Sequence, residues 1–411
     1  MIYQYTHPEF FADWPQPNLQ ELSGRIILYG AGRRGSVAAH CLKKQGIEFI
    51  CFCDSDTKKQ GIKYCGHIII SPKELEAHYT DAAIFITTNH YHYINNDLRK
   101  KGFKEVFSCV SLFSKIDFSG YDVYSVEYMI RNIDQYFYTL IYDGQDVSYI
   151  TQLQIPVTMR CTLRCKECNS YIPYVKIGED FNQVDIISSV SKLLTAYDKI
   201  GNILLYGGEP LLYRNLYQLV QKFADNPQIE KISIVTNGTL MPDKRLLEAL
   251  KNAKVLVRIS DYGELSRKKD ELKALLLAED ICTEITDFKY WNANPTVEAL
   301  NETPGQLRKK VQNCCAIANA ITLIKGKIFF CGFSAFYDYF KAVPDYGDNY
   351  INLLTTEESG RDLKIKIDQI RRMGKDGLPK NACRFCKFNN FADNLPVAEQ
   401  TTETLKFKKV Y

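Results

Sequence analysis

Short apolar segments alternate with amphipathic segments along the first quarter of the chain. Apolar segments of strand length cover residues 25–29, 48–53 and 82–87, and segments with helical spacing cover residues 36–45 and 91–101. Strands that alternate with helices in this way predict a parallel sheet whose faces are covered by helices. This part of the chain is therefore predicted to be an α/β domain.

The same alternation recurs in the middle of the chain, where each predicted strand ends in a polar motif. The strands are residues 153–158, 202–206, 231–236 and 255–259, and helical patterns follow the last three at residues 215–224, 243–251 and 265–277. Parallel α/β sheets and barrels carry their active sites at the carboxyl ends of their strands. The polar motifs are therefore predicted to gather at one face of a second α/β domain.

The patterns and the length of 411 residues divide the chain into several parts. We predict a leader segment (1–23), a first α/β domain (24–113), an aromatic-rich connector (114–150), a second α/β domain (151–300) and a cysteine-rich region (301–411). The connector is rich in tyrosine and has no sustained Gly, Pro or Ser tract. We therefore expect it to pack the first domain against the second instead of acting as a loose linker.

Composition and charge exclude several classes of protein. With 45% hydrophobic and 24% charged residues, the chain is predicted to fold and not to be disordered or collagen-like. Fifty-two basic and 48 acidic residues leave a net charge of +4, too small to indicate a nucleic acid or an anionic membrane as the main partner. Residues 1–20 do not resemble a secretory signal, and no stretch of about 20 residues is apolar throughout. The expected location is cytoplasmic.

A glycine-rich turn follows the first predicted strand. Gly30, Gly32 and Gly35 stand between this strand and a helix, and Asp54 ends the next strand. In the dinucleotide-binding layout, such glycines let phosphate approach the start of the helix, and an acidic residue about 20 positions later meets a ribose. Residues 24–113 resemble the Rossmann-like domains attached to enzymes of surface-sugar biosynthesis, which implies a bound nucleotide. The alternative is that the turn only closes a corner and the domain binds nothing, or binds a partner protein.

Three cysteines stand close together after the strand at residues 153–158. Cys161, Cys165 and Cys168 fall within eight residues, and a reducing cytosol disfavours disulfides between them. Three thiolates can hold an iron–sulfur cube and leave its fourth iron open for substrate or cofactor. Structural zinc prefers four closed ligands, usually in two short pairs. The spacing therefore favours an iron–sulfur cluster over zinc.

This cysteine loop and the motifs that follow the next three strands together resemble the radical SAM superfamily, over residues 152–300. The resemblance implies a partial (β/α)6 barrel, a 4Fe-4S cluster on the three cysteines, and S-adenosylmethionine chelated to the open iron. It also implies that a reductant such as flavodoxin or ferredoxin supplies the electron that produces a 5′-deoxyadenosyl radical. The residues that it assigns to S-adenosylmethionine are Gly207, Gly208, Glu209, Pro210, Asn237 and Ser260.

One position departs from the pattern of the superfamily. Glu167 precedes the last cysteine of the loop, where an aromatic residue usually packs on the adenine of the cofactor. The departure leaves the cluster ligands unchanged but puts that adenine contact in doubt. The loop sequence looks most like a bacterial subgroup that is often encoded with polysaccharide genes, which implies a carbohydrate or sugar-nucleotide substrate.

A second group of cysteines lies near the C-terminus. Its members are Cys314, Cys315, Cys331, Cys383 and Cys386, and a predicted hairpin over residues 320–331 would bring the first of them towards Cys331. Four thiolates suffice for a closed cluster or for zinc. The group resembles the twitch or shortened SPASM extension of radical SAM enzymes, which implies one auxiliary 4Fe-4S cluster. Cys314 and Cys315 compete for the place of the first ligand.

Three functions follow from these motifs. The favoured one is a radical SAM enzyme that removes a hydrogen atom from a carbohydrate or a sugar nucleotide. The second is a peptide or protein maturase, because twitch and SPASM extensions are common in such enzymes. The third is a non-catalytic nucleotide or redox sensor with a structural metal, which would leave the motifs at residues 207–210, 237 and 260 unexplained.

Overall fold

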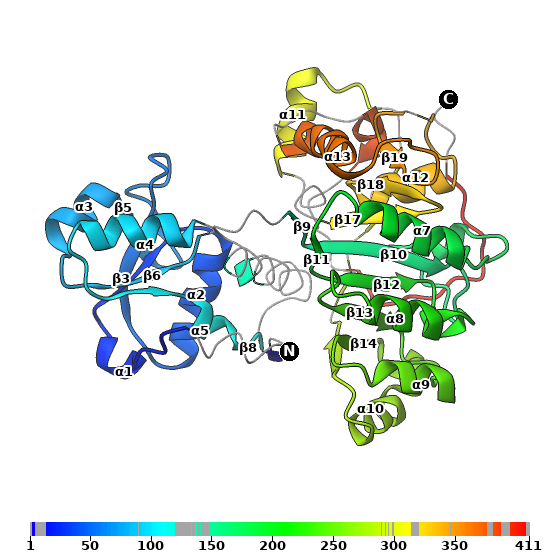
Figure 1. Cartoon of the computed structure of the whole chain (residues 1–411), viewed down its shortest axis with the longest axis horizontal. Helices are drawn as coiled ribbons and strands as arrows, with labels where there is room; N and C mark the ends of the chain where they lie inside the picture. The colour runs from blue at the N-terminus through cyan, green and yellow to red at the C-terminus, as the bar shows by residue number, and fades with distance from the viewer. Residues whose placement is uncertain are drawn as a thin grey trace. The chain divides into compact units, whose positions relative to one another are not determined.

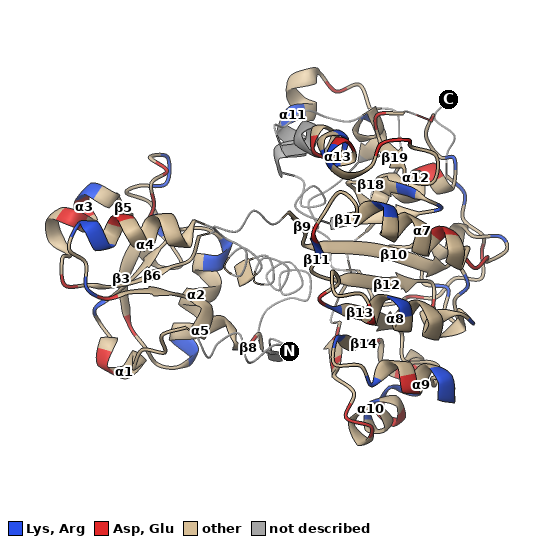
Figure 2. Ribbon diagram, in the orientation of Figure 1, with Lys and Arg blue, Asp and Glu red and all other residues tan. Residues whose placement is uncertain are grey.

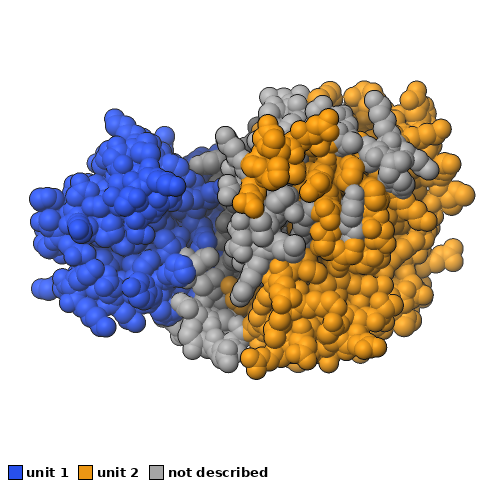
Figure 3. Space-filling view, turned by 90° about the horizontal axis from the view of Figure 1, so that it is seen from above, with its two compact units in different colours: residues 1–146 blue, residues 147–411 orange. Residues whose placement is uncertain are grey.

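The computed structural model describes most of the chain, and the chain divides into two compact units, residues 1–146 and 147–411 (Figure 3). The described residues are 2–4, 14–88, 90–119, 133, 136–137, 140, 148–288, 290–291, 293–294, 296–297, 300–313, 320–345, 347–375, 381–387 and 395–407. Basic and acidic side chains are interspersed over both units, in keeping with the small net charge (Figure 2). In the described residues no helix is both long enough and apolar enough to span a bilayer.

A six-stranded sheet forms the centre of the first unit (Figure 1). Its strand order is β4 (Lys63–Tyr64), β5 (His67–Ile70), β3 (Phe49–Cys53), β2 (Ile26–Tyr29), β6 (Ala83–Ile86) and β7 (Val106–Ser108). All neighbours are parallel except the β4–β5 hairpin. The helices are α1 (Leu19–Leu22), α2 (Arg33–Lys44), α3 (Pro72–His78), α4 (Tyr91–Lys100) and α5 (Val110–Phe113), and β1 (Ile2–Gln4) pairs with β8 (Lys115–Asp117).

The elements of this unit follow from the pattern of the sequence. All four residues of β6 are fully buried, as expected for a central parallel strand with both faces covered. Helix α3 begins at a capping box, in which Ser71 and Glu74 satisfy each other's backbone N–H groups. The predicted α/β alternation of strands and helices is confirmed.

The described residues of the connector up to position 140 belong to the first unit, and residues 148–150 belong to the second. Four of its side chains are buried in the core of the first unit: Ile133, Tyr136, Phe137 and Leu140. The Tyr136 hydroxyl donates to the Ile86 carbonyl at 2.9 Å and lies 2.6 Å from the Ser108 hydroxyl. These aromatic side chains therefore help to fill the core beside β6, while most of the connector lies outside the described residues.

An eight-stranded sheet forms the centre of the second unit. Its strand order is β15 (Thr283–Asp287), β14 (Val255–Asp261), β13 (Ile232–Thr236), β12 (Ile203–Gly207), β10 (Gln152–Thr158), β17 (Ala320–Ile324), β18 (Lys327–Phe329) and β19 (Tyr350–Asn352). The first six are parallel, and β18 and β19 are antiparallel to their neighbours. The short strands β9 (Tyr149–Ile150) and β11 (Lys199–Ile200) pair, as do β16 (Thr296–Val297) and β20 (Cys386–Lys387).

Helices connect the strands of this sheet. They are α7 (Gln183–Leu193), α8 (Leu216–Ala224), α9 (Lys244–Leu250), α10 (Lys269–Ala278), α11 (Pro304–Asn313), α12 (Gly332–Tyr339) and α13 (Gly360–Lys375). Short 3-10 helices are η2 (Ile172–Tyr174), η3 (Pro210–Leu212), η4 (Gly263–Leu265) and η6 (Asn381–Phe385). Each of β12, β13 and β14 is followed by a helix, so the strand–helix alternation predicted for this domain is confirmed.

The two faces of the parallel strands differ in character. Alternate residues of β12, β13 and β14, such as Leu205, Ile234 and Val257, share one apolar core with leucines of α8, α9 and α10. The intervening residues point away from these helices. They include Tyr206 and Arg258, both only partly buried. The helices therefore cover one face of the strands, and the opposite face carries both apolar residues, such as Leu256, and polar residues.

The described strands form an open sheet in place of a closed barrel. Strands β10, β12, β13, β14 and β15 are neighbours in chain order, as expected for a partial (β/α)6 barrel. The sixth parallel strand, β17, pairs with β10 instead of β15. The strand that precedes the cysteine loop therefore lies inside the sheet, with hydrogen-bonded neighbours on both sides.

Candidate functional site

The cysteine loop begins directly after β10. Its turns are closed by hydrogen bonds from the Cys168 N–H to the Cys165 carbonyl at 3.2 Å and from the Tyr171 N–H to the Cys168 carbonyl at 2.7 Å. Burial, and to a smaller extent the nearby Cys168 thiol, together raise the pKa of Cys165 to about 12. Burial likewise raises the pKa of Cys161 and Cys168. The loop therefore holds three protonated thiols near one another.

The chemistry of these donors fits an iron–sulfur cluster. Thiolates are soft ligands that suit iron–sulfur clusters, and the loop carries three cysteines within eight residues that become thiolates on binding. Within the described residues, no three His, Cys, Asp or Glu side chains converge as closely as a single metal ion requires. A cube binds each thiolate through a different iron, so its ligands stand farther apart than those of one ion. Because the thiols are protonated, cluster binding must release protons.

The glycine turn after β12 lies against the start of the cysteine loop. The Gly208 N–H donates to the Thr158 carbonyl and the Glu209 N–H donates to the Arg160 carbonyl, each at 2.8 Å. A Cβ atom on Gly207 would lie 2.3 Å from the Thr158 oxygen, and one on Gly208 would lie 2.0 Å from the Arg160 oxygen. Both glycines are therefore needed for this approach, because any side chain would separate the two segments.

Glu209 connects the glycine turn to the end of β13. Its side chain is fully buried and accepts hydrogen bonds from the Leu211 N–H at 3.0 Å, the Thr236 hydroxyl at 2.8 Å and the Asn237 N–H at 2.8 Å. Burial raises the pKa of Glu209 to about 7, although the three hydrogen bonds oppose the rise. The carboxylate thus caps η3 and has a structural role. Its contact with the amino group of a cofactor stays a prediction.

Asn237 reaches from the end of β13 to the cysteine loop. Its Nδ2 donates to the Thr162 hydroxyl at 3.1 Å and lies 3.6 Å from the Cys161 sulfur. Its Oδ1 accepts from the Thr239 hydroxyl at 2.6 Å. Ser260 is buried at the end of β14, the next strand, and its carbonyl accepts from the Ser266 hydroxyl. The predicted motifs are therefore brought to the same ends of adjacent strands.

Glu167 makes a polar contact in place of the aromatic one. Its carboxylate accepts from the Asn294 N–H at 2.8 Å, and the Asn294 side-chain amide donates to the Cys168 carbonyl at 2.7 Å. Aromatic rings do border the loop, because Tyr262 and Trp291 pack edge to face at 5.4 Å beside Cys165 and Cys168. These rings lie about 100 residues from the loop in sequence, so no local signal could have identified them.

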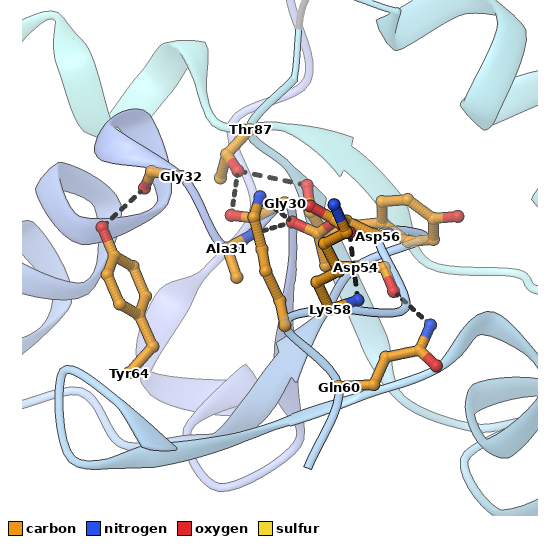
Figure 4. Close-up of polar contacts among 11 residues, drawn as sticks. Gly30, Ala31, Gly32, Asp54, Asp56, Lys58, Gln60, Tyr64 and Thr87 are labelled. Atoms are coloured by element: carbon orange, nitrogen blue, oxygen red, sulfur yellow. Dashed lines mark hydrogen bonds and ion pairs between the residues drawn. The ribbon is translucent and has the colours of Figure 1, made fainter. Parts of the chain in front are cut away.

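The glycine-rich turn of the first unit is closed around Asp54 (Figure 4). The Ala31 N–H donates to the Asp54 carboxylate at 2.9 Å, and Lys59 pairs with it at 3.0 Å. Burial alone would raise the pKa of Asp54, but hydrogen bonds from Asp56, Lys59 and Ala31 hold it below its usual value. The carboxylate predicted to meet a ribose is therefore ionised and lies directly beside the loop.

The three glycines of this turn meet different surroundings. A Cβ on Gly35 would lie 2.1 Å from the Gly30 oxygen, and Gly30 itself has a φ of +122°. A Cβ on Gly32 would have no atom within 4 Å. Gly30 and Gly35 are thus required by the fold, whereas the space beside Gly32 is open.

The structure describes three of the five C-terminal cysteines. Cys331 precedes α12, Cys383 lies in η6, and Cys386 begins β20. Cys331 and Cys386 both lie near the buried Tyr171 and Tyr337 phenols and raise their pKa values, to which burial contributes most. Cys314 and Cys315 lie outside the described residues. Cys331 and Cys386, 55 positions apart, therefore face the same pair of tyrosines.

Comparison with known families gives the class of the second unit. Residues 155–260, which contain the cysteine loop and strands β12 to β14, match the radical SAM superfamily. This segment is a radical SAM domain, which confirms the resemblance predicted from the loop. Members of the superfamily are enzymes that use a 4Fe-4S cluster and S-adenosylmethionine. Residues 22–106 match a second family, described as C2185-like, N-terminal.

Individual relatives match parts of the chain. The GTP 3′,8-cyclase of Clostridium acetobutylicum is 33% identical over 147 residues, which make up 35% of this chain and 40% of that protein. The GTP 3′,8-cyclase of Moorella thermoacetica is 37% identical over 94 residues, or 22% of this chain and 28% of that protein. The chain thus spans less than half the length of these relatives.

Solved structures also resemble the chain. BtrN in complex with AdoMet and 2-DOIA covers 62% of this chain and 98% of its own, with 18% identity and a TM-score of 0.38. The enzyme anSMEcpe with bound AdoMet covers 58% of this chain and 88% of its own, with 16% identity and a TM-score of 0.36.

The buried Glu209 carboxyl predicts a pH-dependent stability. Its pKa rises from 4.5 to about 7 on folding, so the folded state binds this proton more tightly. Between pH 4.5 and 7 the unfolded state loses the proton first, and this group therefore lowers the free energy of unfolding as pH rises, by about 3 kcal/mol in total. Urea denaturation between pH 5 and 7.5, followed by Trp291 fluorescence in a Trp14→Phe background, measures the effect.

Glu209→Gln should remove this dependence on pH. At pH 5 it should also cost about 1–3 kcal/mol, because a Gln amide group would face one of three N–H or O–H donors. This cost should shrink towards pH 7.5, because the wild type loses stability over that range and the variant does not. Glu264→Gln, a change at an exposed position, is the matched control. A Glu209→Gln variant that kept the pH slope of the wild type would assign that slope to another group.

Proposed function

We propose that the chain is a radical SAM enzyme that removes a hydrogen atom from a carbohydrate or sugar-nucleotide substrate. The observation that carries the proposal is the contact between the cysteine loop and the turn at residues 207–210, two segments about 45 positions apart. A structural metal site on the three cysteines would not require the turn at residues 207–210, because this turn supplies no cysteine ligand. The sensor alternative therefore leaves the most constrained contact of the domain unexplained.

The residues of the chain have separate roles in this proposal. When bound, a 4Fe-4S cluster and S-adenosylmethionine supply a 5′-deoxyadenosyl radical by one-electron cleavage. Cys161, Cys165 and Cys168 would hold the cluster, and Asn237 orients the loop through Thr162. The main chain of residues 207–210 is rigidly held and would present its carbonyls to the amino group of the cofactor.

Polar residues on the face opposite the helices support a hydroxylated substrate. Arg258 and Glu284 are register partners on β14 and β15, and their side chains pair at 3.3 Å while only 16% and 17% exposed. Arg258 lies two residues before Ser260 on the same strand, and Tyr206, which precedes Gly207, also points to this face. Arg258 and Tyr206 precede Ser260 and Gly207 in their strands. The row formed by Arg258, Glu284 and Tyr206 therefore lies next to the proposed cofactor residues.

The charge balance of this row favours a neutral hydroxyl over an anion. Arg258 and Glu284 neutralise each other, so neither offers an unbalanced charge to a phosphate or carboxylate group. Together they present N–H donors beside a carboxylate acceptor. A sugar hydroxyl both donates and accepts and can use both partners at once. A peptide backbone offers the same groups, and the test below separates these substrates.

Anaerobic assays test the proposed function. Reconstituted protein, S-adenosylmethionine and dithionite should form 5′-deoxyadenosine, and a matching substrate should increase its rate. A panel of deuterated UDP-hexoses and hexoses should transfer deuterium into 5′-deoxyadenosine, whereas peptides should not. If protein with a full cluster formed no 5′-deoxyadenosine, the proposal that the chain is a radical SAM enzyme would be refuted. If only peptides increased the rate of 5′-deoxyadenosine formation, the chain would be a peptide or protein maturase and not a carbohydrate-modifying enzyme.

We further propose that the first unit binds a nucleotide or a nucleotide sugar through Gly30, Gly32, Gly35 and Asp54. The open space beside Gly32 and the ionised Asp54 support this placement. In the full chain, UDP-glucose and UDP should raise the thermal midpoint of the wild type. Gly32→Val should abolish this shift while keeping the fold, because its side chain enters unoccupied space. Gly35→Ala should lower the midpoint without any ligand, because its Cβ meets the Gly30 carbonyl.

The pair of glycine variants separates binding from stability. Gly102→Ala, a glycine at positive φ in a surface turn of the same unit, serves as the control for general strain. If UDP-sugars did not change the thermal midpoint of the wild type, we would conclude that the first unit is a scaffold that binds no nucleotide. The same conclusion would follow if Gly32→Val kept the full shift.

A further inference from the structure

The segment at residues 395–407, here called the C-terminal strap, lies along the cysteine loop. The Lys166 N–H donates to the Glu399 carbonyl at 2.8 Å, and the Thr401 N–H donates to the Arg164 carbonyl at 2.9 Å. These reciprocal bonds place the strap antiparallel to the loop, with Cys165 opposite Gln400. Two segments more than 230 positions apart thus form a short ladder around a predicted cluster ligand.

Further contacts hold the strap on both sides of this ladder. Before it, Leu395 and Trp291 exchange two backbone hydrogen bonds of 2.8 Å. After it, the Arg164 guanidinium donates to the Glu403 carbonyl at 3.2 Å and to the Thr404 hydroxyl at 3.0 Å. The position of the strap is therefore determined independently of the Cys165 side chain.

Gln400 directs a hydrogen-bond donor at the sulfur of Cys165. Its Nε2 lies 3.1 Å from the sulfur, and its Oε1 accepts from the Arg164 N–H at 2.7 Å. Because the Arg164 N–H needs an acceptor, the amide must place its oxygen there and its nitrogen towards the sulfur. Ala398 and Trp291, both buried, pack against Cys165. The Gln400 side chain itself is exposed, so its amide reaches from the surface to a buried sulfur through a partly buried contact.

We propose that Gln400 is a positioning residue that sets the reduction potential of the cluster held by the cysteine loop. The proposal rests on the proposed function, in which Cys165 is a cluster ligand. Hydrogen bonds to ligand sulfurs stabilise the more negative, reduced state of a cluster and so raise its potential. The Gln400 amide thus makes the cluster easier to reduce, and the strap makes the C-terminal end of the chain part of the cluster environment.

Potentiometric titration of the holoenzyme tests the proposal. The readout is the EPR signal of the reduced cluster that changes on addition of S-adenosylmethionine, because this response identifies the cluster with the open iron. Gln400→Glu keeps an acceptor for the Arg164 N–H but places a carboxylate against the sulfur. At the midpoint of the wild type, its ratio of reduced to oxidised cluster should be about tenfold lower, a shift of about 59 mV to more negative potential. Gln400→Ala should shift in the same direction by a smaller amount.

Two controls keep the outcomes distinct. Thr402→Ala changes an exposed position of the strap and should leave the potential unchanged. If Gln400→Ala fails to retain its cluster, Gln400→Glu decides the question, since it preserves the ladder. Equal midpoints in wild type and Gln400→Glu, at equal iron content, would overturn the inference and leave the proposed function intact. A wild type with no cluster that responds to S-adenosylmethionine would instead overturn the proposed function.

Discussion

Replacing Cys161, Cys165 and Cys168 together by alanine is expected to reduce the formation of 5′-deoxyadenosine to the level of a protein-free control. Without these thiolates the cube has no ligands in the loop, and no open iron remains to chelate S-adenosylmethionine. Liquid chromatography of anaerobic reactions measures the product. Each single variant should lose the same activity, because two thiolates leave one more iron of the cube without a protein ligand.

The matched control is Cys282→Ala, which removes an exposed thiol next to β15 in the same unit. This variant should keep the iron content and the 5′-deoxyadenosine yield of the wild type. A triple variant that still cleaves S-adenosylmethionine at the rate of the wild type would show that the cluster is held elsewhere.

Replacing Cys383 and Cys386 by alanine is expected to lower the iron content from about eight to about four atoms per chain. In the proposed function the loop cluster suffices to cleave S-adenosylmethionine, so uncoupled 5′-deoxyadenosine should persist. Turnover of the substrate should be lost, because the auxiliary cluster would accept an electron from the substrate radical, bind the substrate or hold the C-terminal region in place. Iron and sulfide analysis, together with product assays, measures both effects.

The metal content of the wild type distinguishes the two candidates for this second site. About four irons with one equivalent of zinc would refute an auxiliary cluster and make the site a zinc knot. No histidine follows His92 in the sequence, so such a knot would depend on cysteine alone or on carboxylates. About eight irons, with sulfide to match, would support the cluster.

Local patterns in the sequence predicted the elements that carry the radical SAM motifs. Strands β10, β12, β13 and β14 are short and largely apolar segments, and the cysteine loop, the glycine turn, Asn237 and Ser260 stand at or just after their carboxyl ends. Because neighbouring parallel strands place these ends side by side, Asn237 and Ser260 could be expected close to the cysteine loop. The glycine turn was predicted from its place at the end of a strand and from the family resemblance, and the close approach to Thr158 and Arg160 gives the structural reason for both glycines.

Other parts of the site depend on contacts between distant segments. The pairing of β17 with β10 has no signature in either strand, because an apolar strand can pair with several neighbours. Gln400 and Trp291 reach the loop from segments without regular periodicity, so neither side chain stood out in the sequence. Glu167 was recognised as unusual, but its partner Asn294 could be found only in the structure.

The position of β17 beside β10 limits how the chain can vary between relatives. Thr322 of β17 lies opposite Gln154 of β10, and the hairpin continues through β18 to Cys331. Insertion of one residue into β17 would turn the following side chains to the other face of the sheet and move Cys331 away from Tyr171. Homologous sequences should therefore keep the length of the segment from 320 to 331 constant. Insertions should instead occur between α12 and β19, after the buried Ala342 and Val343, where the chain can lengthen without changing the sheet.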